Sequence, residues 1–201
     1  MSRALLSFGL LAAGIAAEGP CDILAAAGNP CVAAHSTTRA LFSSYAGPLY
    51  NVSRPDGAWY SVPLLAPGGY ANKSAHDAFC PNKDCVISNV YDQTTNLNHL
   101  GQRHKLVNAS RHPIVVGETA VYGMWFDPGY GMHVDATTNV PKGNEPESIY
   151  AVLSGTHYNG NCTLFFLPAK ARSLQPGPHS SPSTRPLSFC TLARPQAALI
   201  M

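Results

Sequence analysis

Short runs of β-branched and aromatic residues recur along the chain, and most are bounded by Gly, Pro, Asn or Asp, as is typical of strands joined by turns. These runs predict six strands, at Leu49–Arg54, Trp59–Val62, Cys85–Tyr91, Pro113–Val116, Ala120–Phe126 and Ser148–Leu153. Residues 149–153 lack polar alternation, so we expect a central strand covered on both faces. Many short strands with little helix favour an all-β protein, an antiparallel β-sandwich or jelly roll.

Helical signals occur in two places. Residues 36–45 begin with Ser36 as an N-cap and end before a Gly-Pro pair, which predicts a short helix. Ser74 followed by Asp77 resembles a capping box and predicts a single turn running into Cys80.

The first 17 residues predict a secretory signal peptide, because Arg3 precedes an unbroken apolar run that ends in small residues at Ala17. The run is shorter than the roughly 20 apolar residues that a membrane-spanning helix needs, and no later segment approaches that length. We therefore expect a secreted, extracellular protein without a membrane partner.

Length and charge narrow the function classes. A chain of 201 residues suits one domain, which we expect to be a monomer. Its 13 Lys and Arg against 11 Asp and Glu give a net charge of +2, without the clustered cations that a nucleic-acid-binding face requires.

Four cysteines close two short loops. Cys21 and Cys31 bracket one turn-rich stretch, and Cys80 and Cys85 bracket another, which favours the disulfides Cys21–Cys31 and Cys80–Cys85. Each loop closure contributes on the order of 2–3 kcal/mol in the chain-entropy model.

A zinc site is the rival interpretation of the cysteines. None of the eight histidines or six cysteines has zinc-ligand spacing, so we expect no metal and no cofactor. Cys162 and Cys190 pair either with each other or with nothing.

Three sequons are expected to carry glycans if the chain is secreted: Asn51, Asn72 and Asn108. Asn161 also fits the sequon, but it is the least favoured because Cys162 occupies its middle position.

The composition changes after Cys162. Residues 163–201 contain no Asp or Glu and hold six prolines among Ser, Arg, Lys and Gly. Such a segment has too few apolar clusters to offset its ordering entropy, so we expect a mostly disordered tail in which only residues 163–167 could form a strand.

Four stretches occur in the order in which a known family has them: GPCDILAAAGNPCVAAHSTTRALFSSYAGPLYNV from Gly19, DAFCPNKDCVISNVYDQTTNLNHL from Asp77, AVYGMWFDPGYG from Ala120 and ESIYAVLSGTHYNGNC from Glu147. Between Gly19 and Cys162 the chain resembles the α-L-arabinofuranosidases of glycoside hydrolase family 54. The resemblance implies a concanavalin-like β-sandwich and a secreted enzyme that removes terminal arabinofuranose from arabinan and arabinoxylan. Its partner would be arabinose-containing plant cell-wall polysaccharide.

The resemblance also implies a retaining mechanism, which uses two carboxyl groups about 5–5.5 Å apart. In the family both carboxylates follow the motif that Cys162 begins, so no catalytic residue is assigned here. The family has two adjacent cysteines against the sugar; here Thr163 follows Cys162, so the vicinal disulfide cannot form. Cys162 stays a candidate substrate-binding residue, and His157 and Tyr158 beside it could contact a sugar.

The acids before Cys162 offer no obvious replacement pair. Most lie beside turns or cysteine loops, where hydrogen bonding to backbone amides is the expected role. Glu118 and Asp127 flank a predicted strand pair and could face a cleft, although solvated surface positions are the simpler expectation.

We therefore divide the chain into a signal peptide (1–17), a partial catalytic domain (18–162) with an incomplete sandwich, and a Pro- and Ser-rich tail (163–201). The leading hypothesis is an arabinofuranosidase by descent whose 201 residues are catalytically inactive. The alternative is a non-catalytic, secreted carbohydrate-binding β-sandwich. Aromatic residues that could stack on sugars are Trp59, Tyr60, Trp125 and Tyr130. A third possibility is a product that does not fold stably, with exposed sheet edges.

Overall fold

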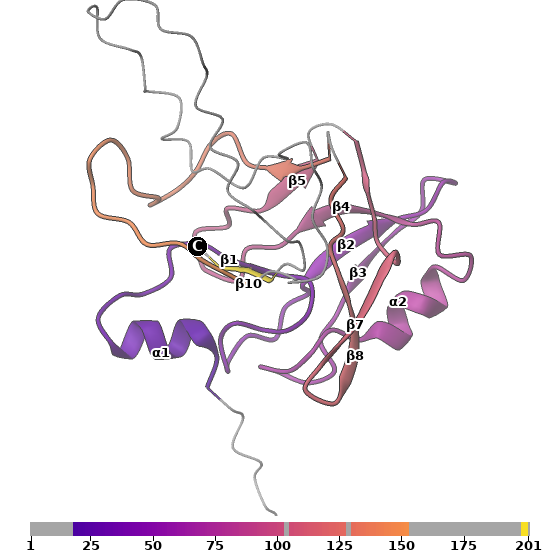
Figure 1. Ribbon diagram of the computed structural model, residues 1–201, viewed down its shortest axis with the longest axis horizontal. Coiled ribbons are helices and arrows are strands. Elements are labelled where there is room, and N and C mark those ends of the chain that lie inside the picture. Colours follow the sequence, from indigo (N-terminus) through magenta and orange to yellow (C-terminus); the bar gives the residue numbers. More distant parts are fainter. Residues whose placement is uncertain (1–17, 103–104, 128–129, 153–197, 201) are drawn as a thin grey trace, which may run out of the picture.

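The structure is a computed structural model that describes residues 18–102, 105–127, 130–152 and 198–200. Its largest element is an antiparallel six-stranded sheet (Figure 1). The strand order is β3-β2-β4-β5-β9, and β6 pairs with β4 beside β5. The strands are β2 Tyr50–Ser53, β3 Trp59–Val62, β4 Val86–Val90, β5 Leu100–Gln102, β6 Val107–Asn108 and β9 Met132–His133.

Two smaller antiparallel units accompany this sheet. Strands β7 His112–Val116 and β8 Thr119–Gly123 form a hairpin, and Gly117 in its turn has φ +62°, a conformation that favours glycine. Strands β1 Ala34–Ser36, β11 Ala198–Ile200 and β10 Tyr150–Val152 form a three-stranded sheet in that order. Residues 198–200 are the described part of the expected tail, and the expectation for its other residues lies outside the described residues.

The two faces of the six-stranded sheet differ because side chains alternate along each strand. On β2, Tyr50 and Val52 are fully buried, whereas Asn51 and Ser53 between them are half-buried. Buried residues from the neighbouring strands complete the core face: Val62, Ile87, Val90, Leu100 and Val107. The opposite face, called here the outer face, carries the polar residues Asn51 and Ser53 of β2.

Helix α2 (Lys73–Phe79) and the β7–β8 hairpin pack on the core face and lie side by side next to β3 (Figure 1). The rings of Tyr60 and Phe79 stack with centroids 5.4 Å apart, and Val121 of β8 joins the same apolar cluster. Burial of these apolar side chains supplies the main stabilising free energy of the fold.

The six predicted strands are all present, with bounds trimmed by one to three residues at most ends. The expected environment of β10 is wrong. Among the described residues it is an edge strand of the three-stranded sheet, and Tyr150 and Val152 are 49% and 45% exposed. An apolar run fixes the residues of a strand but does not fix its place in a sheet.

The helix predicted over residues 36–45 does not form. Ser36 ends β1, and its Oγ accepts hydrogen bonds from the backbone amides of Thr38 and Arg39. Long-range partners take the next amides, because Ala40 N donates to the Gly69 carbonyl and Leu41 N donates to Gln93 Oε1. Tertiary hydrogen bonds therefore override the local helical signal.

The predicted helical turn before Cys80 is a helix of seven residues, α2, with a different cap. Asn72 rather than Ser74 caps it, since Asn72 Oδ1 accepts from Ala75 N at 3.0 Å. A second helix, α1 (Pro20–Ala26), was not predicted. Its first turn is closed by Asp22, whose Oδ2 accepts from Gly19 N at 2.8 Å.

Gly19 is required by close packing. A Cβ placed there would lie 2.1 Å from the Leu41 carbonyl oxygen, which no side chain tolerates. Cys21 N donates to this same carbonyl at 2.9 Å, so α1 rests directly on the segment after β1.

Asp92 is a buried acidic residue whose carboxylate is fully hydrogen-bonded. It is 3% exposed, and its Oδ1 accepts from Ala34 N at 2.8 Å and from Thr94 N at 3.0 Å. Its Oδ2 accepts from Thr94 Oγ1 at 2.8 Å and from Asn98 N at 2.9 Å. One buried carboxylate therefore joins β1 to the loop between β4 and β5.

The variant Asp92→Asn should lose stability, because an amide nitrogen cannot accept the hydrogen bonds made by one of the two carboxylate oxygens. With two charge-assisted bonds lost and two donors left buried, we expect the free energy of unfolding to fall by about 3 kcal/mol. Urea unfolding at pH 7 measures it. The matched control is Asp56→Asn, an exposed acid that should leave the midpoint almost unchanged. Equal midpoints for both variants would contradict the role of Asp92.

Candidate functional site

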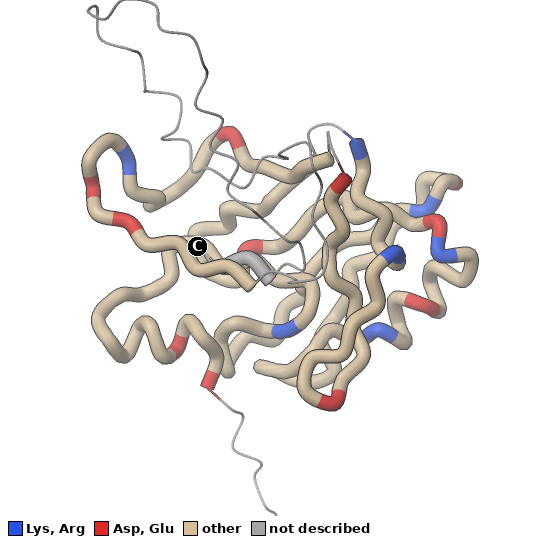
Figure 2. Tube along the Cα trace, viewed as in Figure 1, with Lys and Arg blue, Asp and Glu red and all other residues tan. Residues whose placement is uncertain are grey.

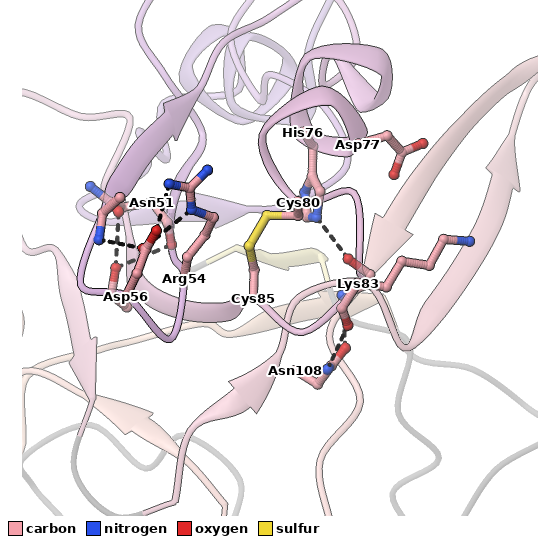
Figure 3. The surroundings of a disulfide bond; sticks show 12 residues. Asn51, Arg54, Asp56, His76, Asp77, Cys80, Lys83, Cys85 and Asn108 are labelled. Atoms are coloured by element: carbon pink, nitrogen blue, oxygen red, sulfur yellow. Dashed lines mark hydrogen bonds and ion pairs between the residues drawn. A yellow bond between two sulfur atoms is a disulfide. The ribbon is translucent and has the colours of Figure 1, made fainter.

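The two expected disulfides are present, Cys21–Cys31 and Cys80–Cys85, with Cα–Cα separations of 5.6 Å and 5.9 Å. Figure 3 shows the second one at the ends of the loop that connects α2 to β4. The candidate sugar-contacting residues Cys162, His157 and Tyr158 lie outside the described residues, as do Cys190 and the sequon at Asn161.

The three favoured sequons lie at half-buried positions. Asn72 caps α2 through its Oδ1. Asn108 Nδ2 donates to the Lys83 carbonyl at 3.1 Å, beside the Cys80–Cys85 disulfide (Figure 3). Asn51 lies in the middle of β2, where its Oδ1 accepts from Ser88 Oγ at 3.0 Å. Glycosylation at these asparagines stays a prediction.

All 11 acidic residues of the chain lie in the described part, so each can be placed. Asp22 is partly buried, which raises its pKa, but hydrogen bonds from Ser43 and Gly19 outweigh burial and lower the pKa below its usual value. Asp77 behaves alike: burial raises its pKa, and hydrogen bonds from Lys73 and Tyr122 lower it overall. A general acid requires the opposite shift.

Other acids form local ion pairs or hydrogen bonds. Asp127 pairs with Arg111 and accepts from Trp125 Nε1, and Asp135 lies 3.2 Å from His133 Nε2. Glu118 occupies the exposed turn of the β7–β8 hairpin. Glu118 and Asp127 therefore take surface roles, the simpler of the two expectations.

One hollow of about 370 Å³ contains two carboxylates, Asp56 and Asp84. Arg54 lines the same hollow, and its Nη2 lies 2.7 Å from Asp56 Oδ2. This hydrogen bond lowers the pKa of Asp56, so Asp56 is unsuited to donate a proton. Asp56 is therefore held in an ion pair with Arg54, and we assign no acid and nucleophile pair for glycoside hydrolysis among the described residues.

A buried network surrounds His76 of α2. Its Nδ1 and the Tyr50 hydroxyl are 2.9 Å apart, and its Nε2 lies 2.9 Å from Ser110 Oγ. Burial lowers the pKa of His76 to about 4. A serine beside a histidine can act as an activated nucleophile. Here His76 is fully buried and Ser110 is 6% exposed, so the contact has a structural role.

The outer face of the six-stranded sheet offers an accessible site. A groove of about 660 Å³, called here the outer-face groove, is lined in part by Ser53, Arg54, Asp84, Ser88, Gln102 and Leu106. A β-bulge opposite Asn51 adds Ser88 to this face as an extra residue. The sequence alone does not indicate this groove, because residues from three strands and three loops form it.

Charges are spread thinly over the described residues, and Figure 2 shows no basic stripe among them. Within the same residues, no helix is both long and apolar enough to cross a membrane. The described part likewise holds no group of three or more His, Cys, Asp or Glu side chains suited to a metal ion.

The antiparallel strands define the class of protein as an all-β protein with a β-sandwich fold. Solved structures of family 54 α-L-arabinofuranosidases superimpose with a TM-score of 0.70 at 42% identity, covering 72% of this chain and 33% of theirs. One such structure was soaked with a cyclic sulfate inhibitor, and another is a complex with arabinofuranosyl-α-1,2-xylobiose.

Sequence comparison identifies the family. Residues 20–180 match the family profile described as "Alpha-L-arabinofuranosidase B, catalytic". The chain is 42% identical to the probable α-L-arabinofuranosidase B of Aspergillus terreus over 81% of its length, and 42% identical to the α-L-arabinofuranosidase of Hypocrea jecorina over 86%. It belongs to the α-L-arabinofuranosidase B family. It spans 35% and 37% of the lengths of these two relatives, and the profile match extends past Cys162.

The low pKa of His76 predicts a stability change with pH. An unfolded histidine has a pKa near 6.5, whereas folding depresses that of His76 to about 4. The contribution of neutral His76 to the free energy of unfolding is therefore fully present above pH 6.5. It is lost as pH falls towards 4, and the free energy of unfolding drops by up to about 3 kcal/mol. Burial lowers the pKa of His35 too, which acts in the same direction. The lowered pKa values of Asp22 and Asp77 change the stability with pH only near and below pH 3.8.

Urea unfolding at pH 7 and pH 4.5 tests this with wild type and His76→Gln. The variant should be less stable at pH 7 but should lose less stability between the two pH values. An identical loss in both proteins would show that His76 does not carry the pH dependence.

Proposed function

We propose that this protein is a secreted α-L-arabinofuranosidase by descent, in which residues 20–152 form the scaffold of the N-terminal part of the catalytic domain. The substrates would be terminal arabinofuranose units on arabinan and arabinoxylan. The observation that supports this most strongly is the profile match over residues 20–180, together with both disulfides. The structure with arabinofuranosyl-α-1,2-xylobiose supports the choice of an arabinose-bearing xylan.

The chemistry of the family limits what these residues contribute. Retaining hydrolysis needs a nucleophilic carboxylate and an acid/base carboxyl about 5–5.5 Å apart. Asp92 is engaged by four donors, and Asp22 and Asp77 hold helices or strands together. We infer that the segment positions and supports a sugar site, and that the carboxylate pair belongs to residues that are not among the 11 acids here.

Secretion and glycosylation remain parts of this proposal. Two disulfides fit an oxidising compartment, and residues 1–17 have the composition of a signal peptide. Sequons at Asn51, Asn72 and Asn108 fit the same location.

A chimera tests whether the segment is a functional part of the family domain. Residues 20–152 would replace the equivalent segment of the Aspergillus niger α-L-arabinofuranosidase B, a relative with 41% identity. We expect hydrolysis of 4-nitrophenyl α-L-arabinofuranoside with kcat/KM within about tenfold of the parent, about 1.4 kcal/mol in activation free energy. Proton NMR of the first product should show the retained anomer.

The control is a chimera that carries Asp92→Asn, which should unfold at lower temperature. A folded chimera with wild-type stability and no hydrolysis would contradict the proposal, because the segment would then fit the fold without supporting the reaction.

A further inference from the structure

The outer face of the six-stranded sheet carries an ordered row of polar side chains. Tyr91 Oη lies 2.9 Å from Ser61 Oγ on β3 and 3.4 Å from Asn51 Nδ2 on β2. Ser88 of β4 continues the row by donating to Asn51 Oδ1. Hydroxyl and amide groups from three neighbouring strands are thereby held in fixed positions on one surface.

Trp59 belongs to this surface. On β3, Tyr60 and Val62 face the core, so Trp59 and Ser61 point to the outer face. Trp59 is 67% exposed and lies directly opposite Ser53, which lines the outer-face groove. An indole ring exposed to this degree beside a polar groove provides a flat apolar platform.

The groove combines polar and apolar walls. Gln102 and Ser88 supply amide and hydroxyl groups, and Leu106, which is 40% exposed, supplies an apolar surface. A sugar ring has the complementary chemistry, because its C–H groups form apolar faces and its hydroxyls form a polar rim. A volume of about 660 Å³ holds a short stretch of an oligosaccharide.

The charges in the groove select against acidic ligands. Arg54 is the cation of its lining, and Asp56 neutralises it through two hydrogen bonds at 3.2 Å and 2.7 Å. Asp84 adds a carboxylate to the same lining. A phosphorylated or uronic-acid ligand would meet an excess of negative charge, whereas a neutral saccharide would not.

We propose that the outer-face groove and Trp59 together form a saccharide-binding surface for the neutral xylose main chain of an arabinose-bearing xylan. The choice of this polymer rests on the proposed function. Trp59 stacks on a xylose ring, and Gln102 and Ser88 hydrogen-bond to hydroxyls of the neighbouring residues. The surface would hold the main chain of the polymer on the scaffold.

Affinity electrophoresis of the full 201-residue chain tests the proposal in native gels that contain soluble arabinoxylan. The protein is prepared without N-glycans, because a glycan on Asn51 would lie on the same face and could occupy the groove itself. Wild type should be retarded in arabinoxylan gels and should not be retarded in dextran gels. Trp59→Ala and Gln102→Ala should each weaken binding at least fivefold.

The matched control is Val115→Ala, which removes an equally exposed apolar side chain, 69% exposed, from the β7–β8 hairpin that packs on the core face. It should bind like wild type. Absence of retardation for wild type, or equal retardation of wild type and Trp59→Ala, would overturn the proposal. Thermal unfolding of each variant verifies that the chain is folded.

Tryptophan fluorescence gives a second measurement of saccharide binding, at Trp59 itself. The chain has two tryptophans, so Trp125→Phe leaves Trp59 as the one indole. Xylohexaose should shift the emission of Trp59 to shorter wavelength, and an unchanged spectrum at saturating xylohexaose would contradict stacking. Binding is measured on this chain and hydrolysis on the chimera, so either proposal can fail while the other stands.

Discussion

The buried carboxylate of Asp92 is the interaction on which the described structure depends most. It accepts four hydrogen bonds, from a strand 58 residues earlier in the chain and from its own loop. Burying a charge costs free energy unless donors surround it, and here the donors are mostly backbone amides that would otherwise lack partners. These hydrogen bonds consequently fix the β4–β5 loop against β1. Through β1 they also fix the position of the N-terminal segment that contains the Cys21–Cys31 disulfide.

Much of the fold follows from local patterns, and the failures have a common cause. Strands such as Trp59–Val62 and turns closed by Cys80 and Cys85 could be predicted because alternation and turn residues act over a few positions. The helix expected over residues 36–45 is wrong because Gln93 and Gly69 bind the amides there. Such partners are distant in sequence and leave no local signal.

The candidate site likewise combines features that local sequence patterns predict with features that depend on residues distant in sequence. The sequence could indicate that most of its acids lie beside turns or cysteine loops, and the structure shows Asp22, Asp77 and Asp92 occupied with hydrogen-bond donors. It could not indicate the outer-face groove, because Ser53, Ser88 and Gln102 come together only when three strands pair. The bulge that presents Ser88 depends on the register between β2 and β4, which no single strand encodes.

These residues form a scaffold of the α-L-arabinofuranosidase B family, and we propose that their own carboxylates serve structure rather than catalysis. The most direct measurement is the release of 4-nitrophenol from 4-nitrophenyl α-L-arabinofuranoside by the purified, folded 201-residue chain. We expect release no faster than in a sample of the same preparation after heat denaturation. Release at an enzymatic rate that co-purifies with the chain and disappears when one of its 11 acids is replaced by its amide, with folding intact, would contradict it.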